Sequence, residues 1–169
     1  DRMGIRTEYE YDSRGNLTVI KNPLEKIGLE YDEKGDLTSV KDLVSGLTLH
    51  EFDYDPVGNR VSRKDVQKAE SGEPERVIRY AFNGLGQVTK TTGPPPESAE
   101  TKYDYDLGGN LRARTDANGN PTSYEHNYQG QVTRVTDALG YETRMEYGTG
   151  CPACGAGVDR LTSVTDARK

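Results

Sequence analysis

The sequence has few of the residues that usually build a compact hydrophobic core. Leu, Ile, Val and Phe together account for 30 of its 169 residues, Trp is absent, and the mean hydropathy is −0.87. This share of large apolar side chains lies below the roughly 20% at which composition alone begins to suggest disorder. No apolar run approaches the roughly 18 residues of a membrane-spanning helix, so we expect no membrane span.

Cysteine is scarce as well, and positive charge does not predominate. Two Cys are too few for a small domain held together by many disulfides. The 22 Lys and Arg are outnumbered by 28 Asp and Glu, and the basic residues are scattered, which argues against nucleic acid as a partner. What is left is either a disordered acidic chain or a chain whose order does not show in its composition.

An internal repeat of about 21 residues indicates order. Residues 103–111 read YDYDLGGNL, and residues 9–17 read YEYDSRGNL. Each copy has two aromatic slots separated by one residue, then Asp or Asn, a Gly and an aliphatic residue. The second slot falls at residues 11, 31, 54, 82, 105, 126 and 147, which predicts a single array of about seven repeats over 1–169. Eleven of the thirteen aromatic residues occupy these slots, so the spacing is not accidental.

Two sets of residues are expected to define the repeat structurally. The second aromatic slots hold Tyr11, Tyr31, Tyr54, Phe82, Tyr105, His126 and Tyr147. The turn glycines are Gly15, Gly35, Gly58, Gly86, Gly109 and Gly130.

Each copy predicts a β-hairpin. Side chains alternate along a strand, so the two aromatic slots lie on one face. The Asp or Asn that follows can cap a turn, and Gly supplies the positive φ that a tight turn requires. The return strand is rich in β-branched residues. Leu17 and Ile20 are three residues apart, which breaks simple alternation and predicts a β-bulge near the turn.

A hairpin of this size cannot bury its own apolar face, so the copies are expected to stack. The predicted fold is all-β, with tandem hairpins forming a continuous antiparallel strip. Longer spacings predict loop insertions near 64–76 and 93–101. A third insertion, at 148–158, interrupts the seventh copy.

These signatures resemble the YD repeats of the RHS family, from Tyr9 to Asp166. The family includes bacterial polymorphic toxins, shell components of insecticidal toxin complexes, and teneurins. The resemblance implies a strip that spirals into a hollow shell, which in the toxins encloses a C-terminal effector. It also implies a secreted or cell-surface location, with flanking repeats of a longer chain and an encapsulated toxin domain as partners. Seven copies supply only part of a wall, so we expect the chain to be a fragment.

The predicted function is therefore a non-catalytic structural segment of a shell that encapsulates or displays a toxin. The alternative is a repeat module at the cell surface that binds carbohydrate or protein, with surface glycans as possible ligands. Rows of exposed rings would favour the binding module, and rings buried between copies would favour the wall. The Asp residues recur in every copy with turn spacing, whereas a catalytic pair is singular, so we expect no enzyme and no catalytic or cofactor-binding residues.

One chemical feature does not repeat. Cys151-Pro152-Ala153-Cys154 presents two thiols with the spacing of half a zinc site. A structural zinc site needs four ligands, which a neighbouring segment or chain would have to complete. The preferred interpretation is an inserted turn, with its thiols free or joined locally, and no metal or cofactor.

Overall fold

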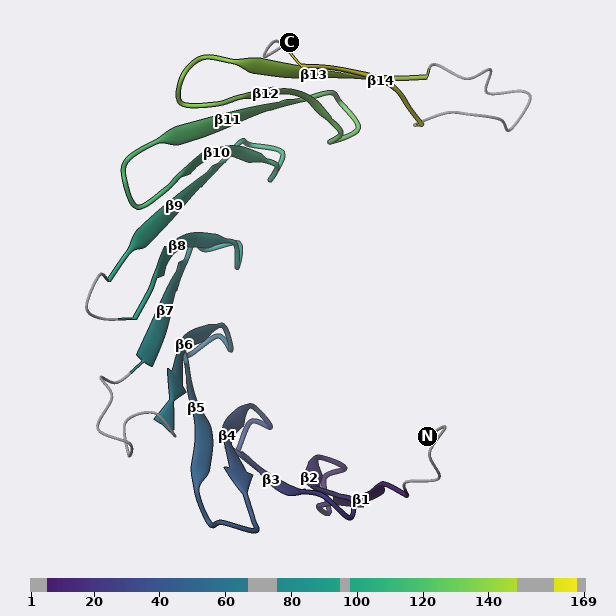
Figure 1. Cartoon of the computed structure of the whole chain (residues 1–169), viewed down its shortest axis with the longest axis vertical. Helices are drawn as coiled ribbons and strands as arrows, with labels where there is room; N and C mark the ends of the chain where they lie inside the picture. The colour runs from purple at the N-terminus through teal and green to yellow at the C-terminus, as the bar shows by residue number, and fades with distance from the viewer. Residues whose placement is uncertain (1–5, 67–75, 95–97, 149–159, 167–169) are drawn as a thin grey trace. The chain divides into compact units, whose positions relative to one another are not determined.

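The computed structural model describes residues 6–66, 76–94, 98–148 and 160–166. In these residues the chain runs as a succession of antiparallel hairpins, as Figure 1 shows. It divides into two compact units, Asp1–Ala99 and Glu100–Lys169. The predicted all-β fold is confirmed.

The first unit contains four described hairpins. Their strands are β1 (Glu8–Tyr11) and β2 (Leu17–Lys21), β3 (Lys26–Tyr31) and β4 (Leu37–Asp42), β5 (Thr48–Tyr54) and β6 (Arg60–Asp65), and β7 (Arg76–Phe82) and β8 (Val88–Thr92). Neighbouring hairpins also pair, through β2 with β3, β4 with β5, and β6 with β7. The strand order in this unit therefore follows the chain order.

The second unit contains three described hairpins of the same kind. Their strands are β9 (Glu100–Tyr105) and β10 (Leu111–Thr115), β11 (Pro121–His126) and β12 (Val132–Thr136), and β13 (Glu142–Tyr147) and β14 (Leu161–Asp166). Here too the hairpins pair with one another, through β10 with β11 and β12 with β13.

The three predicted insertions lie near strand ends, but 64–76 overlaps the end of β6 and the start of β7, and 93–101 overlaps the start of β9. β6 ends at Asp65 and β7 begins at Arg76, and residues 67–75 between them lie outside the described part. The insertion predicted at 93–101 is closed by a backbone hydrogen bond from Gly93 N to Ala99 O at 2.8 Å. The insertion at 148–158 precedes β14, and its residues 149–158 are outside the described part of the chain.

The predicted β-bulge is present in each described hairpin. In the first, Glu10 pairs with Val19 and Tyr11 pairs with Leu17, so Thr18 is an extra residue. The same shift precedes the second aromatic slot in the other six hairpins. The extra residue explains why aliphatic residues three apart lie on one face.

Each unit is a single layer with two different faces. Alternation and register place the aromatic slots and the aliphatic residues opposite them on one face, the aromatic face, as for Tyr9 and Ile20. The residue between the two slots, such as Glu10, lies on the other face, the polar face. Among the described residues no large side chain is fully buried, and the buried hydrophobic residue is Val77, at 8% exposure. The apolar side chains are therefore partly buried all along the strip, and they do not gather into one fully buried core.

In the described part of the chain no helix has the length and apolar character needed to cross a membrane.

Candidate functional site: a ladder of bulged hairpins

The turn inside each repeat, here called the YD turn, is held by the residue after the second aromatic slot. In the first YD turn Gly15 N donates to Asp12 O at 3.1 Å, and Asp12 N donates to Asn16 O at 2.9 Å. The Asp12 carboxylate also accepts the N–H groups of Arg14 and Asn16, at 2.9 and 2.8 Å. The side chain therefore completes a turn that the backbone alone would leave partly unsatisfied.

A second contact braces the same turn. Asn16 Nδ2 donates to Asp12 Oδ2 at 2.9 Å. Where the turn begins with Asn, the partner is Gln: Asn83 Nδ2 donates to Gln87 Oε1 at 2.8 Å. The sequence therefore offers two equivalent pairs, Asp with Asn and Asn with Gln, for one structural task.

The turn glycines have the backbone conformation for which Gly is suited. The values of φ are +88° at Gly15, +93° at Gly35, +91° at Gly58, +75° at Gly86, +85° at Gly109 and +79° at Gly130. At Gly130 a Cβ would also lie 3.0 Å from Asn110 Oδ1 of the preceding YD turn. Backbone conformation and close packing both favour Gly at this position.

A threonine satisfies a backbone carbonyl at the bulge. Thr18 Oγ1 donates to Glu10 O at 3.2 Å, and Thr38 Oγ1 donates to Glu30 O at 3.1 Å. Equivalent bonds come from Thr89, Thr133 and Thr162. The recurrence of Thr was visible in the sequence, but its role depends on the register that the bulge creates.

The tyrosine of the second aromatic slot joins its repeat to the preceding one. Tyr31 OH donates to Leu17 O at 2.9 Å, and Tyr54 OH donates to Leu37 O at 2.9 Å. Tyr147 OH donates to Val132 O at 2.8 Å. Burial raises the pKa of Tyr54, in keeping with a hydroxyl held as a neutral donor. The ring packs while the hydroxyl bonds across the hairpin boundary.

The remaining second slots occupy the same register position. Tyr11 lies opposite Leu17, Phe82 opposite Val88, Tyr105 opposite Leu111, and His126 opposite Val132. Phe82 has no hydroxyl, so this copy of the slot cannot make the phenol bond.

Successive YD turns of the first unit also touch. Arg14 Nη1 donates to Glu33 O at 2.8 Å, and Lys34 Nζ donates to Pro56 O at 3.0 Å. Hollows of about 610 and 420 Å³ lie beside these contacts, between the first and second YD turns and between the second and third. Their recurrence marks them as products of the repeat and not as a singular catalytic cleft.

The rings are covered in the inner strands and exposed in the outer one. All the aromatic slots of β3 to β13 are half-buried, whereas Tyr9 and Tyr11 on β1 are 55% and 62% exposed. On β14, Leu161 and Val164 of the same face are 52% and 56% exposed. Neighbouring hairpins therefore supply the burial, as expected when repeats stack.

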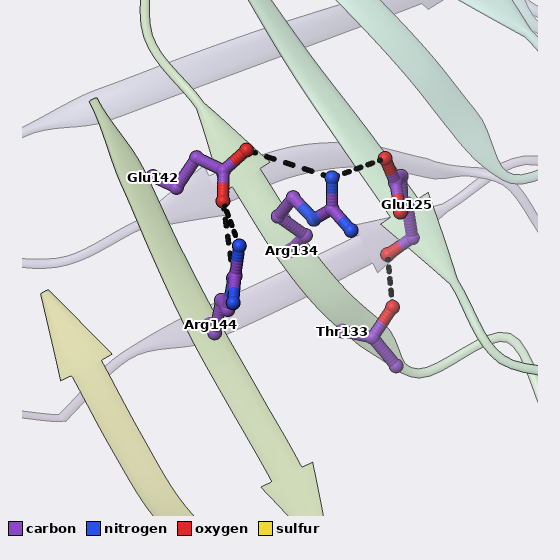
Figure 2. A network of polar contacts seen from close by, with 5 residues as sticks. All are labelled: Glu125, Thr133, Arg134, Glu142 and Arg144. Atoms are coloured by element: carbon purple, nitrogen blue, oxygen red, sulfur yellow. Dashed lines mark hydrogen bonds and ion pairs between the residues drawn. The ribbon is translucent and has the colours of Figure 1, made fainter. Parts of the chain in front are cut away.

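The polar face carries a ladder of paired charges. Arg134 Nη1 lies 3.3 Å from Glu125 Oε1 and 3.5 Å from Glu142 Oε1, so one cation links β11, β12 and β13 (Figure 2). Glu142 Oε2 accepts bonds from Arg144 Nε and Nη2, at 3.0 and 2.6 Å. Thr133 donates to the backbone of Glu125 beside them (Figure 2).

Several carboxylates are held ionised by their hydrogen bonds. A donated Asn16 side-chain bond, followed by backbone N–H groups, lowers the pKa of Asp12. The pKa is lowered likewise for Asp32, Asp42, Asp55, Asp106 and Asp116, through bonds donated within their own turns. On the polar face, bonds from Lys41 and Arg144 lower the pKa of Glu30 and Glu142. Each shift has a structural cause that recurs or belongs to an ion pair.

The described residues contain no group of three or more His, Cys, Asp and Glu side chains placed to hold a metal ion. Cys151 and Cys154 lie outside the described part of the chain, so their state stays a prediction. The repeated Asp residues considered as acid–base groups are found capping turns, as Asp12 and Asp116 do.

Comparison with known proteins supports the same architecture. The RHS Repeat family model matches residues 103–142. The structure of a Tc holotoxin pore from Photorhabdus luminescens, carrying a mutated TccC3, aligns with 95% of this chain at a TM-score of 0.72 and 13% identity. The crystal structure of TcdB2-TccC3-Cdc42 aligns with 86% of the chain at a TM-score of 0.54 and 15% identity. Among curated proteins, none matches the chain.

At these identities the structural likeness concerns the fold alone. This chain spans about a tenth of the matched chains, 9% and 10% of their lengths. The family match at 103–142 runs from within β9 through β10, β11 and β12 to the first residue of β13, and the turns and bulges of these strands recur in the other described hairpins. Residues 103–142 thus match the RHS Repeat model, and the other described hairpins have the same turn and bulge, in agreement with the YD-repeat resemblance of the sequence.

Proposed function

We propose that this chain is a length of wall in an RHS-type shell, which encapsulates or displays a toxin or other effector and has no catalytic activity of its own. Its partners would be flanking repeats of a longer chain and the enclosed domain, in a secreted or surface-displayed assembly. It would need no metal or cofactor.

The observation that carries this proposal is the distribution of exposure on the aromatic face. The rings of the inner strands are half-buried by neighbouring hairpins, while Tyr11 on β1 and Val164 on β14 stay 62% and 56% exposed. Outer strands with unpaired backbone and apolar side chains are templates for further pairing. A wall built by sheet continuation would cover them with the next repeat.

The alternative of a carbohydrate- or protein-binding module predicts rows of exposed rings. The half-burial of the inner rings does not favour it. Tyr128 is 95% exposed, but it lies on a turn and does not belong to the rows of aromatic slots.

Size-exclusion chromatography with light scattering, combined with far-UV circular dichroism, tests the proposal on the whole chain. We expect a β-rich spectrum and association that grows with protein concentration. Val164→Lys, which places a charge on the outer strand β14, should shift the chain toward monomer. Leu139→Lys is the matched control, because Leu139 is 82% exposed on the turn between β12 and β13 and is not part of an outer strand.

A β-rich monomer at all concentrations, with no effect of Val164→Lys, would mean that the strands protect their own edges. That result would favour a self-sufficient binding module over a wall segment.

A further inference from the structure

The third repeat departs from the pattern on its aromatic face. The aliphatic slot after the YD turn holds Leu17, Leu37, Val88, Leu111, Val132 and Leu161 in the other repeats. In the third repeat it holds Arg60, and the Thr that usually follows is replaced by Val61. Six of the seven repeats have an aliphatic residue at this position, so the fold does not require a cation there.

The structure places the Arg60 guanidinium between two rings of adjacent hairpins. Its Cζ lies 5.3 Å from the centroid of Phe52 and 5.9 Å from that of Tyr80. Cation–π attraction at such distances orients the planar group without using its N–H donors. The residue as a whole is exposed.

The hydrogen-bonding capacity of Arg60 is unused within the described residues. The neighbouring Arg63, on the same face, is neutralised by Asp65, with 3.1 Å between Nη2 and Oδ1. Asp65 also lies 2.9 Å from His50 Nδ1. Arg60 has ring contacts but no ion pair and no hydrogen bond among these residues, so it presents a fixed and uncompensated donor edge to solvent.

We propose that Arg60 is an anchor for a carboxylate on an extended polypeptide segment that lies against the aromatic face. The proposal rests on the proposed function, since the occupant would be an acidic, apolar-flanked stretch of the polypeptide that the shell encloses. The planar guanidinium matches a carboxylate in bidentate geometry, and the flanking rings of Phe52 and Tyr80 match apolar neighbours.

The surrounding charges favour a single carboxylate over a more highly charged anion. The charged residues that line the hollow beside Phe52 and Tyr54 are one cation, Lys34, and four carboxylates: Asp32, Asp36, Asp53 and Asp55. These carboxylates would repel a phosphate group carrying nearly two negative charges. One carboxylate at the guanidinium, with apolar side chains over the rings, meets the least repulsion.

The test is a titration of the whole chain with the peptide acetyl-Ala-Leu-Glu-Leu-Ala-amide and with its Gln counterpart. Binding is followed by the Nε–H signal of Arg60 in ¹H–¹⁵N spectra and by calorimetry. We expect the Glu peptide to shift that signal. We expect the Gln peptide to bind more weakly, by a factor of about ten or greater.

Two variants and a control separate anchoring from folding. Arg60→Leu restores the residue found elsewhere in this slot, so we expect an unchanged or higher Tm together with loss of the Glu preference. Arg60→Lys keeps the charge but loses the planar fork, and should retain only part of the preference. Arg112→Leu removes one positive charge from the polar face, where Arg112 bonds to Asp104, and should leave the Glu preference intact.

Equal binding of the two peptides, or equal losses in Arg60→Leu and Arg112→Leu, would overturn the proposal. So would a Tm for Arg60→Leu far below that of the wild type, because Arg60 would then serve the fold. Peptide binding and self-association are separate measurements, so the anchor can fail while the wall proposal stands.

Discussion

The aromatic face and the polar face are made by the same strands, yet the two faces differ in whether their contacts join neighbouring repeats or stay within one repeat. On the aromatic face, Tyr31 and Tyr54 each bond to a carbonyl of the preceding repeat, and their rings are half-buried. On the polar face, Glu30 accepts from Ser39 and is paired with Lys41, both within its own hairpin. One face thus joins repeat to repeat, while the other mostly ties strands inside a repeat.

This difference indicates how a single-layer sheet can be stable with few aliphatic side chains. Burial of rings between hairpins supplies most of the free energy, because apolar area removed from water contributes far more than exposed ion pairs. The polar face, where Glu30 and Arg144 side chains are 55% and 64% exposed, contributes mainly to register and solubility. Variants on the two faces should therefore differ in size of effect and in dependence on salt.

The largest expected effect comes from removing a ring of an inner strand. Tyr54→Ala loses both the ring contacts and the bond to Leu37, and we expect unfolding to become easier by about 2–3 kcal/mol. Tyr11→Ala, at the same slot of β1 but 62% exposed, should cost less than about 1 kcal/mol. Urea unfolding followed by circular dichroism measures both, and equal costs would erase the distinction between inner and outer strands.

Acid should weaken the turns and the polar face, because their carboxylates become protonated, and should leave the phenol bonds of Tyr31 and Tyr54 unchanged. The pKa of six turn Asp residues lies below the ordinary 3.8, and that of Glu30 and Glu142 below the ordinary 4.5. A lowered folded-state pKa stabilises the fold above the ordinary value, and this stabilisation is lost as the pH falls through the folded pKa. We expect Tm to be level above about pH 5 and to fall steadily below about pH 4.

The chain offers its own control for the acid effect. Asp55→Asn combined with Asn59→Gln reproduces the pair found at Asn83 and Gln87, which does not titrate as an acid. This double variant should fold at neutral pH and lose less Tm between pH 5 and pH 3 than the wild type. An unchanged slope would show that the turn carboxylates do not set the acid response.

Spacing alone predicted the hairpins, the Asp caps and the bulge, because each depends on residues close in sequence. Leu17 and Ile20 sit three apart, and only an extra residue such as Thr18 places both on one face. The aromatic slots could also be assigned to one face from their alternation.

Contacts that cross strands could not be predicted in the same way. The bond from Tyr31 to Leu17 O and the ion pairs of Arg134 depend on the register between strands, which the sequence does not state. The stacking of Arg60 on Phe52 and Tyr80 joins residues of three strands, and its only signal was a cation in an aliphatic slot.

Replacing Tyr54 by Phe on the aromatic face separates the contribution of the phenol hydrogen bond from that of the ring, and we expect a smaller effect than that of Tyr54→Ala. Tyr54→Phe keeps the packing but leaves Leu37 O without this donor, and we expect a loss of about 1 kcal/mol. Tyr11→Phe is the control, because the Tyr11 hydroxyl has no hydrogen-bond partner among the described residues, and it should be neutral within about 0.3 kcal/mol. Equal losses of stability in the two variants would show that the phenol hydrogen bond does not help to link the repeats.

The smallest effect is expected on the polar face, and it tests the contrast most directly. Arg134→Gln removes the pairing with Glu125 and Glu142 while keeping much of the side-chain volume, and we expect a cost of about 0.5 kcal/mol or less at low salt. In 1 M salt the cost should vanish, because exposed charges are screened over about 3 Å. Arg144→Gln, whose ion-pair partner within the described ranges is Glu142 alone, should cost still less. A salt-independent loss as large as that of Tyr54→Phe would mean that the Arg134 network holds β11, β12 and β13 together as firmly as the phenol bond holds neighbouring repeats, and the two faces would then share the task of stacking.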